Sequence, residues 1–207
     1  MYRAIDENRD QSYFLFNTTR EQLNYLRFPL GSFLKSETRA IAKKLDLNVA
    51  DKPDSQDICF VPNGDYASVI RKFKPDSFQK GNIKNIYGEV MGEHKGLPLY
   101  TIGQRRVLSL SDSTPYYVVK IDKEQNSIVL GKEDDLYSSK ISVSSVNWVS
   151  ISAPVTPITA SVKLRSAHHG ANANLIPVSG NKVFLELEKP ERAVTPGQSA
   201  VFYKDDI

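Results

Sequence analysis

The chain has 207 residues, of which 40% are hydrophobic and 25% are charged, values that are ordinary for a globular protein. No apolar run approaches the roughly 20 residues of a membrane span, so no membrane partner is expected. A single cysteine excludes an internal disulfide and favours a reducing, cytoplasmic setting, and with three histidines it makes a zinc cluster unexpected. The net charge of +3 selects no class of partner.

The N-terminal third of the chain predicts short helices separated by loops. Thr18 and Thr19 are suitable N-caps for a helix over residues 20–28, because a threonine hydroxyl can accept a free amide of the first turn. A better helix is predicted over residues 36–47, with lysines near its C-terminal end. Asp65 is a suitable cap for a third helix over residues 66–73.

After Pro75 the pattern changes from helices to strands. Residues 82–94 and 97–110 are predicted as strands with turns between them. YYVVKID and SIVLGK flank KEQN (123–126), which predicts a hairpin. From about residue 140 the pattern is all β and indicates a small barrel or sandwich. The predicted fold class is therefore α+β, with separate modules rather than a βαβ series.

The only cysteine, Cys59, lies in the stretch DSQDICF (54–60) and allows two interpretations. A free cysteine is usually a small buried hydrophobic residue. The polar residues before it instead indicate a loop, where a thiol that gains thiolate character becomes a nucleophile. Local pattern alone favours the buried residue and leaves the nucleophile open.

Four other stretches combine polar or charged residues with turns or aromatic residues. Each can be a solvated surface loop, or a set of contacts to phosphates and bases in which cations set the register. No glycine-rich phosphate loop ending in Gly-Lys-Ser/Thr occurs among them. They are ENRDQSYF (7–14), GEHKGLPLYTIGQRR (92–106), KLRSAHHG (163–170) and TPGQSAVFY (195–203).

Taken together, these motifs resemble one family, the tRNA-specific 2-thiouridylases, which thiolate the wobble uridine of certain tRNAs. The resemblance follows the family's order of motifs and spans almost the whole chain. The matching stretches are RDQSYFL (9–15), FPLG (28–31), R-x-IA (39–42), DSQDICF (54–60), GEHKGLPLYTIGQRR (92–106) and TPGQSAVFY (195–203).

The resemblance implies a domain plan and a missing part. Residues 1–62 correspond to the C-terminal remnant of the family's catalytic nucleotide-binding α/β domain, residues 63–137 to its central β-rich module, and residues 138–207 to its C-terminal antiparallel β-barrel. The family's ATP-binding pyrophosphate loop, its catalytic Asp and its first catalytic Cys have no counterpart in this sequence. The chain is therefore expected to be a fragment, or the product of a shortened gene. The site for ATP with Mg²⁺ is expected to lie outside this chain.

The resemblance also implies a reaction and a role for Cys59. In the family, ATP adenylates the C2 oxygen of the uridine, and a cysteine persulfide then delivers sulfur to C2. By motif, Cys59 matches the cysteine that carries the persulfide. The implied sulfur donor is a sulfur-relay protein or a cysteine desulfurase. Since it lacks the ATP site, the chain alone is expected to be inactive in thiolation.

By the same resemblance, six residues correspond to positions at which the family contacts tRNA. Three belong to the RDQSYFL motif, two follow a predicted strand, and one belongs to the TPGQS turn. The target base has to leave its stack to be modified, so polar and aromatic groups are expected around it. The six are Arg9, Asp10, Gln11, Arg165, Ser166 and Gln198.

Two alternatives of other classes stay open beside the enzyme portion. A non-catalytic tRNA-binding β module would bind tRNA without needing Cys59, and its affinity would fall steeply with salt. An unrelated β-barrel interaction protein would not bind tRNA at all.

Overall fold

The computed structural model describes the chain except for residues 54–60, 62–64 and 106–114. The residues gather in two compact units. The first unit combines Met1–Asp54 with Ser139–Pro190 and Pro196–Ile207, and the second combines Ser55–Ser138 with Glu191–Thr195. Among the described helices, none is long and apolar enough to cross a bilayer.

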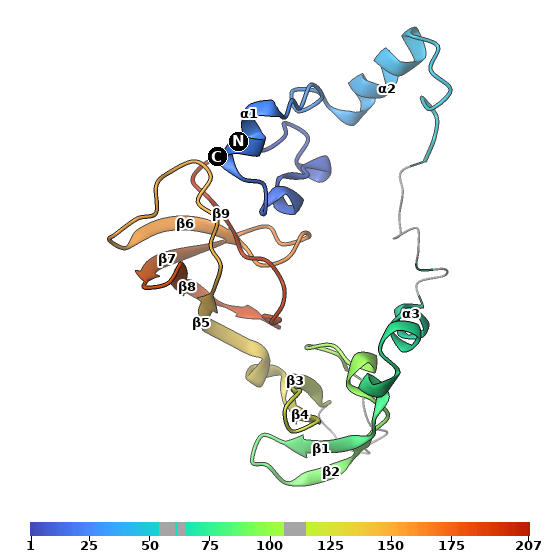
Figure 1. Cartoon of the computed structure of the whole chain (residues 1–207), viewed down its shortest axis with the longest axis vertical. Helices are drawn as coiled ribbons and strands as arrows, with labels where there is room; N and C mark the ends of the chain where they lie inside the picture. The colour runs from blue at the N-terminus through green and yellow to red at the C-terminus, as the bar shows by residue number, and fades with distance from the viewer. Residues whose placement is uncertain (54–60, 62–64, 106–114) are drawn as a thin grey trace. The chain divides into compact units, whose positions relative to one another are not determined.

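The first unit is built on a five-stranded sheet in the order β5-β8-β7-β6-β9 (Figure 1). Strand β6 pairs antiparallel with β7 and with β9, and β7 pairs antiparallel with β8. The strands are β5 (Tyr137–Val143), β6 (Ile158–Lys163), β7 (Ala171–Val178), β8 (Lys182–Arg192) and β9 (Val201–Tyr203).

One face of this sheet forms the apolar core of the first unit. Along β8, Val183, Leu185 and Leu187 are buried and alternate with exposed residues, which is the period of a strand with one covered face. Leu175 of β7 and Val162 of β6 are completely buried as well. The all-β pattern predicted from about residue 140 is therefore confirmed, and it forms a sheet with one buried face.

The N-terminal part of the first unit is helical and contributes little to the core. It comprises the 3₁₀ turns η1 (Glu7–Arg9) and η2 (Ser12–Leu15) and the helices α1 (Arg20–Tyr25) and α2 (Lys35–Lys44). Neither α1 nor α2 has a buried residue. Helices this short are marginal by themselves, so caps and tertiary contacts have to hold them.

Thr19 caps α1 as predicted. Its hydroxyl accepts the amide of Gln22 (3.2 Å), and the Gln22 side chain accepts the amide of Thr19 (2.9 Å), which completes a capping box. Helix α2 begins at Lys35, one residue before the predicted start. There the Glu37 carboxylate accepts the amide of Leu34 (2.7 Å). Glu37 thus takes part of the capping role that Leu34 cannot fill with its own side chain.

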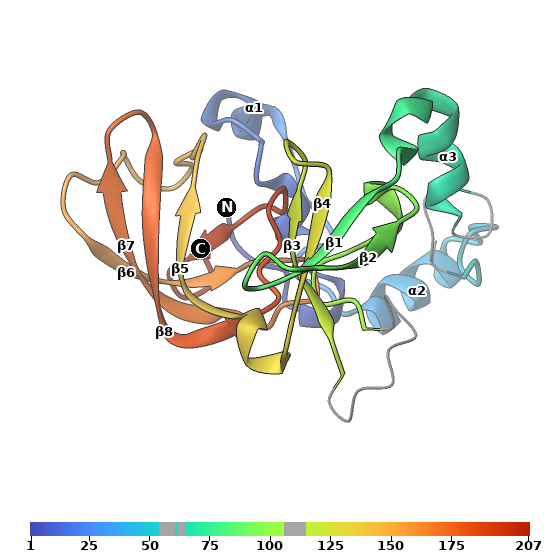
Figure 2. The same cartoon turned by 90° about the horizontal axis from the view of Figure 1, so that it is seen from below.

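The second unit contains a four-stranded sheet in the order β2-β1-β4-β3 (Figure 2). Strands β1 and β4 are parallel, and the outer pairs are antiparallel hairpins. The elements are α3 (Tyr66–Phe73), η4 (Pro75–Phe78), β1 (Gly81–Asn85), β2 (Val90–His94), η5 (Leu97–Leu99), β3 (Tyr117–Asp122), β4 (Ser127–Gly131) and η6 (Glu133–Leu136).

The core of the second unit is a small apolar cluster with a buried histidine beside it. Ile83, Val118, Ile128 and Leu130 are completely buried. His94 is also completely buried, and its Nδ1 accepts the amide of Gly96 (3.1 Å) while its Nε2 lies 3.0 Å from the carbonyl oxygen of Asn126. Since Nδ1 accepts, Nε2 carries the proton and donates. Both nitrogens are satisfied, so His94 is a structural residue.

The predicted features of the second unit are mostly confirmed. Asp65 caps α3 by accepting the amide of Ser68 (3.0 Å). The hairpin over KEQN joins β3 and β4. The strand predicted over residues 97–110 is wrong in its described part, which is the 3₁₀ turn η5 followed by a single bridge from Arg105 to Tyr117. The rest of that range lies outside the described residues. Pro98 removes a backbone donor there, which disfavours a strand.

The two sheets and few helices agree with an α+β chain. The domain boundaries predicted after residues 62 and 137 stay a prediction. In space, the helical N-terminal residues form one compact unit with the C-terminal sheet.

Replacing Leu185 by Ala should lower the free energy of unfolding by about 2–5 kcal/mol, because the side chain is completely buried and the surrounding sheet can only partly close the cavity. Urea denaturation of the chain measures the loss. The control is Val155→Ala, since Val155 is 94% exposed and its loss should change the free energy by less than about 0.5 kcal/mol. Equal effects of the two substitutions would contradict the assigned core.

Candidate functional site

The N-terminal segment of the first unit lies against β9 and the residues around it. The amide of Arg3 donates to the carbonyl oxygen of Asp206 (2.8 Å), and the Arg3 guanidinium stacks 3.8 Å from the centre of the Tyr203 ring. Figures 1 and 2 show the two ends of the chain side by side. The motif that begins at Arg9 is therefore held beside the motif that ends at Tyr203.

Three buried hydroxyl groups connect these motifs. The Ser12 hydroxyl lies 2.8 Å from the phenol oxygen of Tyr203, and the Tyr13 phenol donates to the carbonyl oxygen of Ser199 (3.0 Å). Ser12, Tyr13 and Tyr203 are only 5%, 7% and 4% exposed. Buried hydroxyls are costly unless they are paired, and these are paired across the junction between the two ends of the chain.

Asp10 organises the turn that precedes Ser12. One of its carboxylate oxygens accepts the amides of Ala4 (3.2 Å) and Ser12 (3.1 Å), and the other accepts the Ser12 hydroxyl (2.7 Å). The Asp10 side chain thus connects Ala4 and Ser12 of its own segment through three hydrogen bonds. Among the three predicted contact residues of this motif, Asp10 is the one that is partly buried.

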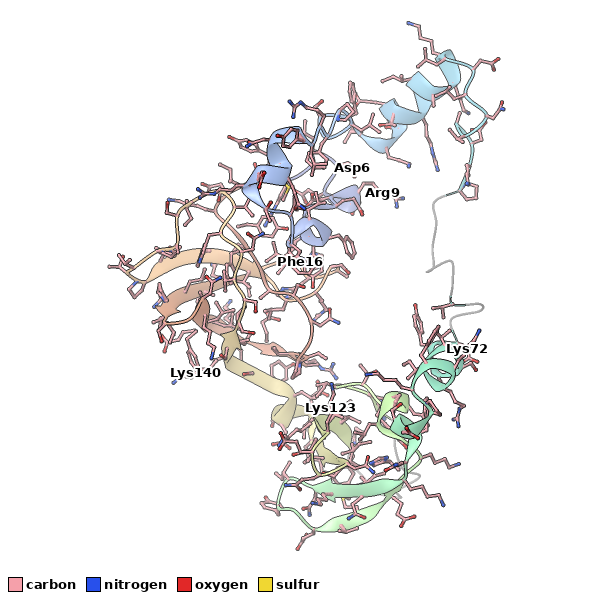
Figure 3. The ribbon with its side chains drawn as sticks, in the orientation of Figure 1. Asp6, Arg9, Phe16, Lys72, Lys123 and Lys140 are labelled. Atoms are coloured by element: carbon pink, nitrogen blue, oxygen red, sulfur yellow. The ribbon has the colours of Figure 1, made fainter. Side chains whose placement is uncertain are left out.

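Arg9 and Gln11, on either side of Asp10, are exposed. Figure 3 shows the side chain of Arg9 pointing outward from η1. The hydrogen bonds of Asp10 to Ala4 and Ser12 fix the turn on which its exposed neighbours, Arg9 and Gln11, lie. The motif therefore presents a cation and an amide from a turn of defined shape.

Gln198 is displayed by a turn at the start of β9. Gly197 has a φ of 89°, a left-handed conformation that glycine adopts without strain. Gln198 is exposed, and the next residue, Ser199, supplies the carbonyl oxygen that accepts the Tyr13 phenol. The exposed amide of Gln198 is thus one residue from a contact to the N-terminal motif.

Arg165 and Ser166 lie at the same end of the sheet as Gln198. Strand β6 ends with Lys163 paired to Val201, where β9 begins. Because the two strands are antiparallel, the residues after β6 and the residues before β9 emerge at one end. Arg165 and Ser166 are both exposed there.

His168 has a structural role in the turn after β6. Its Nδ1 accepts the amide of Leu164 (3.2 Å), its own amide donates to the carbonyl oxygen of Arg165 (3.0 Å), and its side chain is buried. His169 is exposed. The two adjacent histidines therefore lie in different environments, one buried and one exposed.

The structure thus brings Arg165, Ser166 and Gln198 to one end of the sheet as exposed groups, and a hydrogen bond joins the segment that carries Arg9 and Gln11 to the turn of Gln198. Cys59 and Arg106 lie outside the described residues. Arg105, the other arginine of the GQRR stretch, is exposed and bridges to Tyr117 in the second unit. Over the described part of the chain, no group of three or more His, Cys, Asp or Glu side chains could hold a metal ion.

Sequence reasoning missed Ser12, Tyr13 and Tyr203, although all three lie inside its motifs. The available signal was chemical: each motif places a hydroxyl residue beside apolar neighbours, as in SYFL and AVFY. Such a hydroxyl needs a hydrogen-bond partner when it is buried together with its apolar neighbours. The partners lie at the other end of the chain, so the local pattern could not name them.

Three family models match the chain in succession. The tRNA methyl transferase HUP domain matches residues 1–63, the tRNA methyl transferase PRC-barrel domain matches residues 68–132, and the aminomethyltransferase beta-barrel domain matches residues 138–207. Among the proteins that match over the whole chain are tRNA-specific 2-thiouridylases called MnmA.

The chain belongs to the MnmA family of tRNA-specific 2-thiouridylases. It is 46% identical to the MnmA of Orientia tsutsugamushi and 49% identical to that of Dinoroseobacter shibae, with all of the chain covered in both cases. It is 48% identical to the MnmA of Neorickettsia sennetsu over 98% of the chain. The matches cover 56%, 55% and 55% of these relatives, so the chain spans just over half the length of an MnmA protein.

The buried phenol of Tyr203 predicts a loss of stability in alkali. Its pKa is raised, first because burial disfavours the phenolate, and the nearby charge of Asp10 raises it further. A raised pKa gives a stabilising contribution that is complete below the unfolded value of about 10 and is lost as the pH rises through the folded value.

We therefore expect the thermal midpoint of the chain to fall from about pH 9 to about pH 11, and to fall less in Tyr203→Phe. Part of the fall should persist in that variant, because the pKa of Tyr13 is also raised by burial. Tyr25→Phe is the control, since Tyr25 is 81% exposed, and it should keep the full pH dependence. The same pH profile in Tyr203→Phe and Tyr25→Phe would contradict this assignment.

Proposed function

We propose that this chain is the tRNA-binding and sulfur-carrying portion of a 2-thiouridylase. The observation that supports the proposal is that three distant motifs of the first unit carry exposed groups. Two of these motifs meet at one end of the sheet, and the third is hydrogen-bonded to them through Tyr13 and Ser199. These groups belong to Arg9 and Gln11, to Arg165 and Ser166, and to Gln198. Membership of the MnmA family supports tRNA as the partner.

The chemistry of the exposed groups suits an RNA loop. Arg9 and Arg165 supply positive charge for phosphates, and their guanidinium groups can bond a phosphate in a bidentate manner. The amides of Gln11 and Gln198 can donate and accept hydrogen bonds, as the edges of unstacked bases and the ribose hydroxyls require. In this proposal the cations set the position of the tRNA, and the amides contact its bases and sugars.

Exposed aromatic rings beside the site fit the same partner. Phe14 lies within the motif that begins at Arg9 and Phe16 directly follows it, and they are 60% and 46% exposed. Bases that leave their stack in a single-stranded loop stack readily on such rings. Phenylalanine rings that are exposed next to arginine and glutamine therefore support a single-stranded RNA segment as the ligand.

Cys59 is proposed as the persulfide carrier. The support is its motif, DSQDICF, and the family to which the chain belongs. The outer sulfur of a Cys59 persulfide would attack C2 of the uridine, and the bond from C2 to the activated oxygen would break. The S–S bond of the resulting adduct would then be cleaved by a second thiol, which releases 2-thiouridine and leaves a disulfide with Cys59. This sequence contains no second cysteine, so that thiol is proposed to come from outside the chain. The proposed supplier of the persulfide sulfur is a relay protein or a cysteine desulfurase, and the proposed location is the cytoplasm.

ATP with Mg²⁺ is proposed to bind to residues outside this chain. The sequence has no glycine-rich phosphate loop, and the described residues include no carboxylate cluster for Mg²⁺. No step through ATP is therefore assigned to this chain. Activation of the uridine oxygen is proposed to need residues that this sequence does not contain, so the 207-residue chain alone is not expected to thiolate tRNA.

The chain should bind tRNA in a gel-shift titration, and Arg9→Ala and Arg165→Ala should each weaken binding on the order of tenfold at low salt, because each removes a charge-assisted contact. Each substitution should also reduce the slope of log affinity against log salt by about one phosphate contact. Titrations at several salt concentrations measure both quantities.

The matched control is Lys182→Ala. Lys182 is exposed, but it pairs with Val178 at the end of the sheet opposite to Lys163 and Val201. This variant should keep the affinity and the salt slope of the parent chain. If Arg9→Ala and Arg165→Ala leave the tRNA affinity unchanged, or if Lys182→Ala lowers it as much as they do, the proposed site is wrong.

Replacing Cys59 by Ala separates the enzyme portion from a binding module. The parent chain, incubated with a cysteine desulfurase and cysteine, should gain the mass of one sulfur atom that a reductant removes, because a thiolate accepts persulfide sulfur. Cys59→Ala should gain no sulfur and should bind tRNA as the parent does. A parent chain that binds tRNA but takes up no sulfur would favour the non-catalytic tRNA-binding module instead.

A further inference from the structure

The buried hydroxyl groups between the two ends of the chain take no part in the proposed contacts to tRNA. Ser12, Tyr13 and Tyr203 are each at most 7% exposed, so none of them can be a principal tRNA contact. Yet each lies within a few residues of an exposed candidate contact. Any effect of these three hydroxyl groups on tRNA binding must therefore come through the turns beside them.

The hydrogen bonds from Tyr203 to Asp10 have one consistent direction. The Asp10 carboxylate can only accept, so the Ser12 hydroxyl donates to it (2.7 Å). The single proton of Ser12 is then used, and its oxygen accepts from the Tyr203 phenol (2.8 Å). The sequence of bonds runs from Tyr203 through Ser12 to a charged acceptor, and bonds that end on a charge are stronger than neutral ones.

A second bond reaches the displayed turn itself. The Tyr13 phenol donates to the carbonyl oxygen of Ser199, the residue directly after Gln198. Asp10, at the other side, lies directly between Arg9 and Gln11. The two bonds therefore connect the backbone that carries Arg9 and Gln11 to the backbone that carries Gln198.

The charge of Asp10 argues against a direct contact between this side chain and a phosphate. A carboxylate beside a phosphate is repelled by it, and the Asp10 oxygens accept three hydrogen bonds from Ala4 and Ser12 of their own segment. These three bonds instead favour an effect of Asp10 on the ligand through the turn that it shapes.

We propose that Asp10, Ser12, Tyr13 and Tyr203 are positioning residues that hold the turn of Arg9 and Gln11 in a fixed register with the turn of Gln198, so that both turns meet one tRNA segment as a preformed surface. Such preorganisation raises affinity because the ordering of both turns is complete before the ligand arrives. The proposal rests on the proposed function, since it needs tRNA as the ligand of the two turns.

The test uses tyrosine-to-phenylalanine substitutions in the 207-residue chain. Tyr13→Phe and Tyr203→Phe each remove one hydroxyl and keep the ring, including the ring of Tyr203 on which Arg3 stacks. Each should weaken tRNA binding by about two- to tenfold, the range that one hydrogen bond covers. Tyr25→Phe, at an 81% exposed position of α1, should leave binding unchanged.

A double-mutant cycle separates positioning from a general loss of stability. If Tyr13 acts by holding Gln198, then Tyr13→Phe should have little further effect once Gln198→Ala has removed the displayed amide. A purely structural defect would instead weaken binding by the same factor in both backgrounds. Should Tyr203→Phe fail to fold, the cycle with Tyr13→Phe alone decides the matter.

The outcomes distinguish this proposal from the proposed function. Non-additive losses from Tyr13→Phe and Gln198→Ala support the positioning role. Additive losses, or none from the tyrosine variants while Arg9→Ala and Gln198→Ala still weaken binding, overturn the positioning role and leave the tRNA site intact. If Arg9→Ala and Gln198→Ala have no effect, the tRNA site is wrong and the positioning role falls with it.

Discussion

The buried contact between the Ser12 hydroxyl and the Tyr203 phenol is the interaction on which the arrangement of the first unit depends. The N-terminal segment contributes no strand to the sheet, and its helices α1 and α2 bury no side chain. Apolar packing therefore supplies little to hold it. Specific hydrogen bonds have to do so, and a buried hydroxyl that loses its partner costs roughly 1–3 kcal/mol, which makes alternative placements of the segment unfavourable.

Other polar contacts extend this junction along the segment. The Asn147 amide donates to the carbonyl oxygens of Phe16 (3.1 Å) and Thr18 (2.9 Å), and the Arg20 guanidinium donates to those of Val149 (2.7 Å) and Ile151. All of these acceptors are backbone oxygens. In each of these bonds a side chain of one partner donates to the backbone of the other, so the bonds hold the backbone path of the acceptor in place.

The features that the sequence predicts correctly are local, and those that it could not predict are long-range. The caps at Thr19 and Asp65 and the hairpin over KEQN need only residues within a few positions, and all three are confirmed. Ser12 and Tyr203 are 191 residues apart, and no propensity or periodicity joins them. The strand predicted over residues 97–110 is wrong in its described part because Pro98 outweighs the alternation of its neighbours.

The candidate site follows the same division. The six predicted tRNA contacts came from resemblance, and the exposed positions of five of them are consistent with that role, which stays a prediction. Resemblance assigns a residue to a site without saying how it acts, so it could not distinguish Asp10, which bonds inward, from Arg9 and Gln11. That distinction needs the three hydrogen bonds on its carboxylate.

The order of segments in the first unit has a consequence for the synthesis of the protein. Residues 1–53 leave the ribosome long before Ser199 and Tyr203 have been made, and these are the residues to which the hydroxyl groups of Tyr13 and Ser12 bond. Contacts so distant in sequence form slowly, because a long loop has to close first. The sheet of residues 81–131 can close while the chain is still being translated, and the helical N-terminal segment, with its exposed apolar side chains, has to wait. We expect that interval to be the time at which a nascent chain of this protein most needs a chaperone.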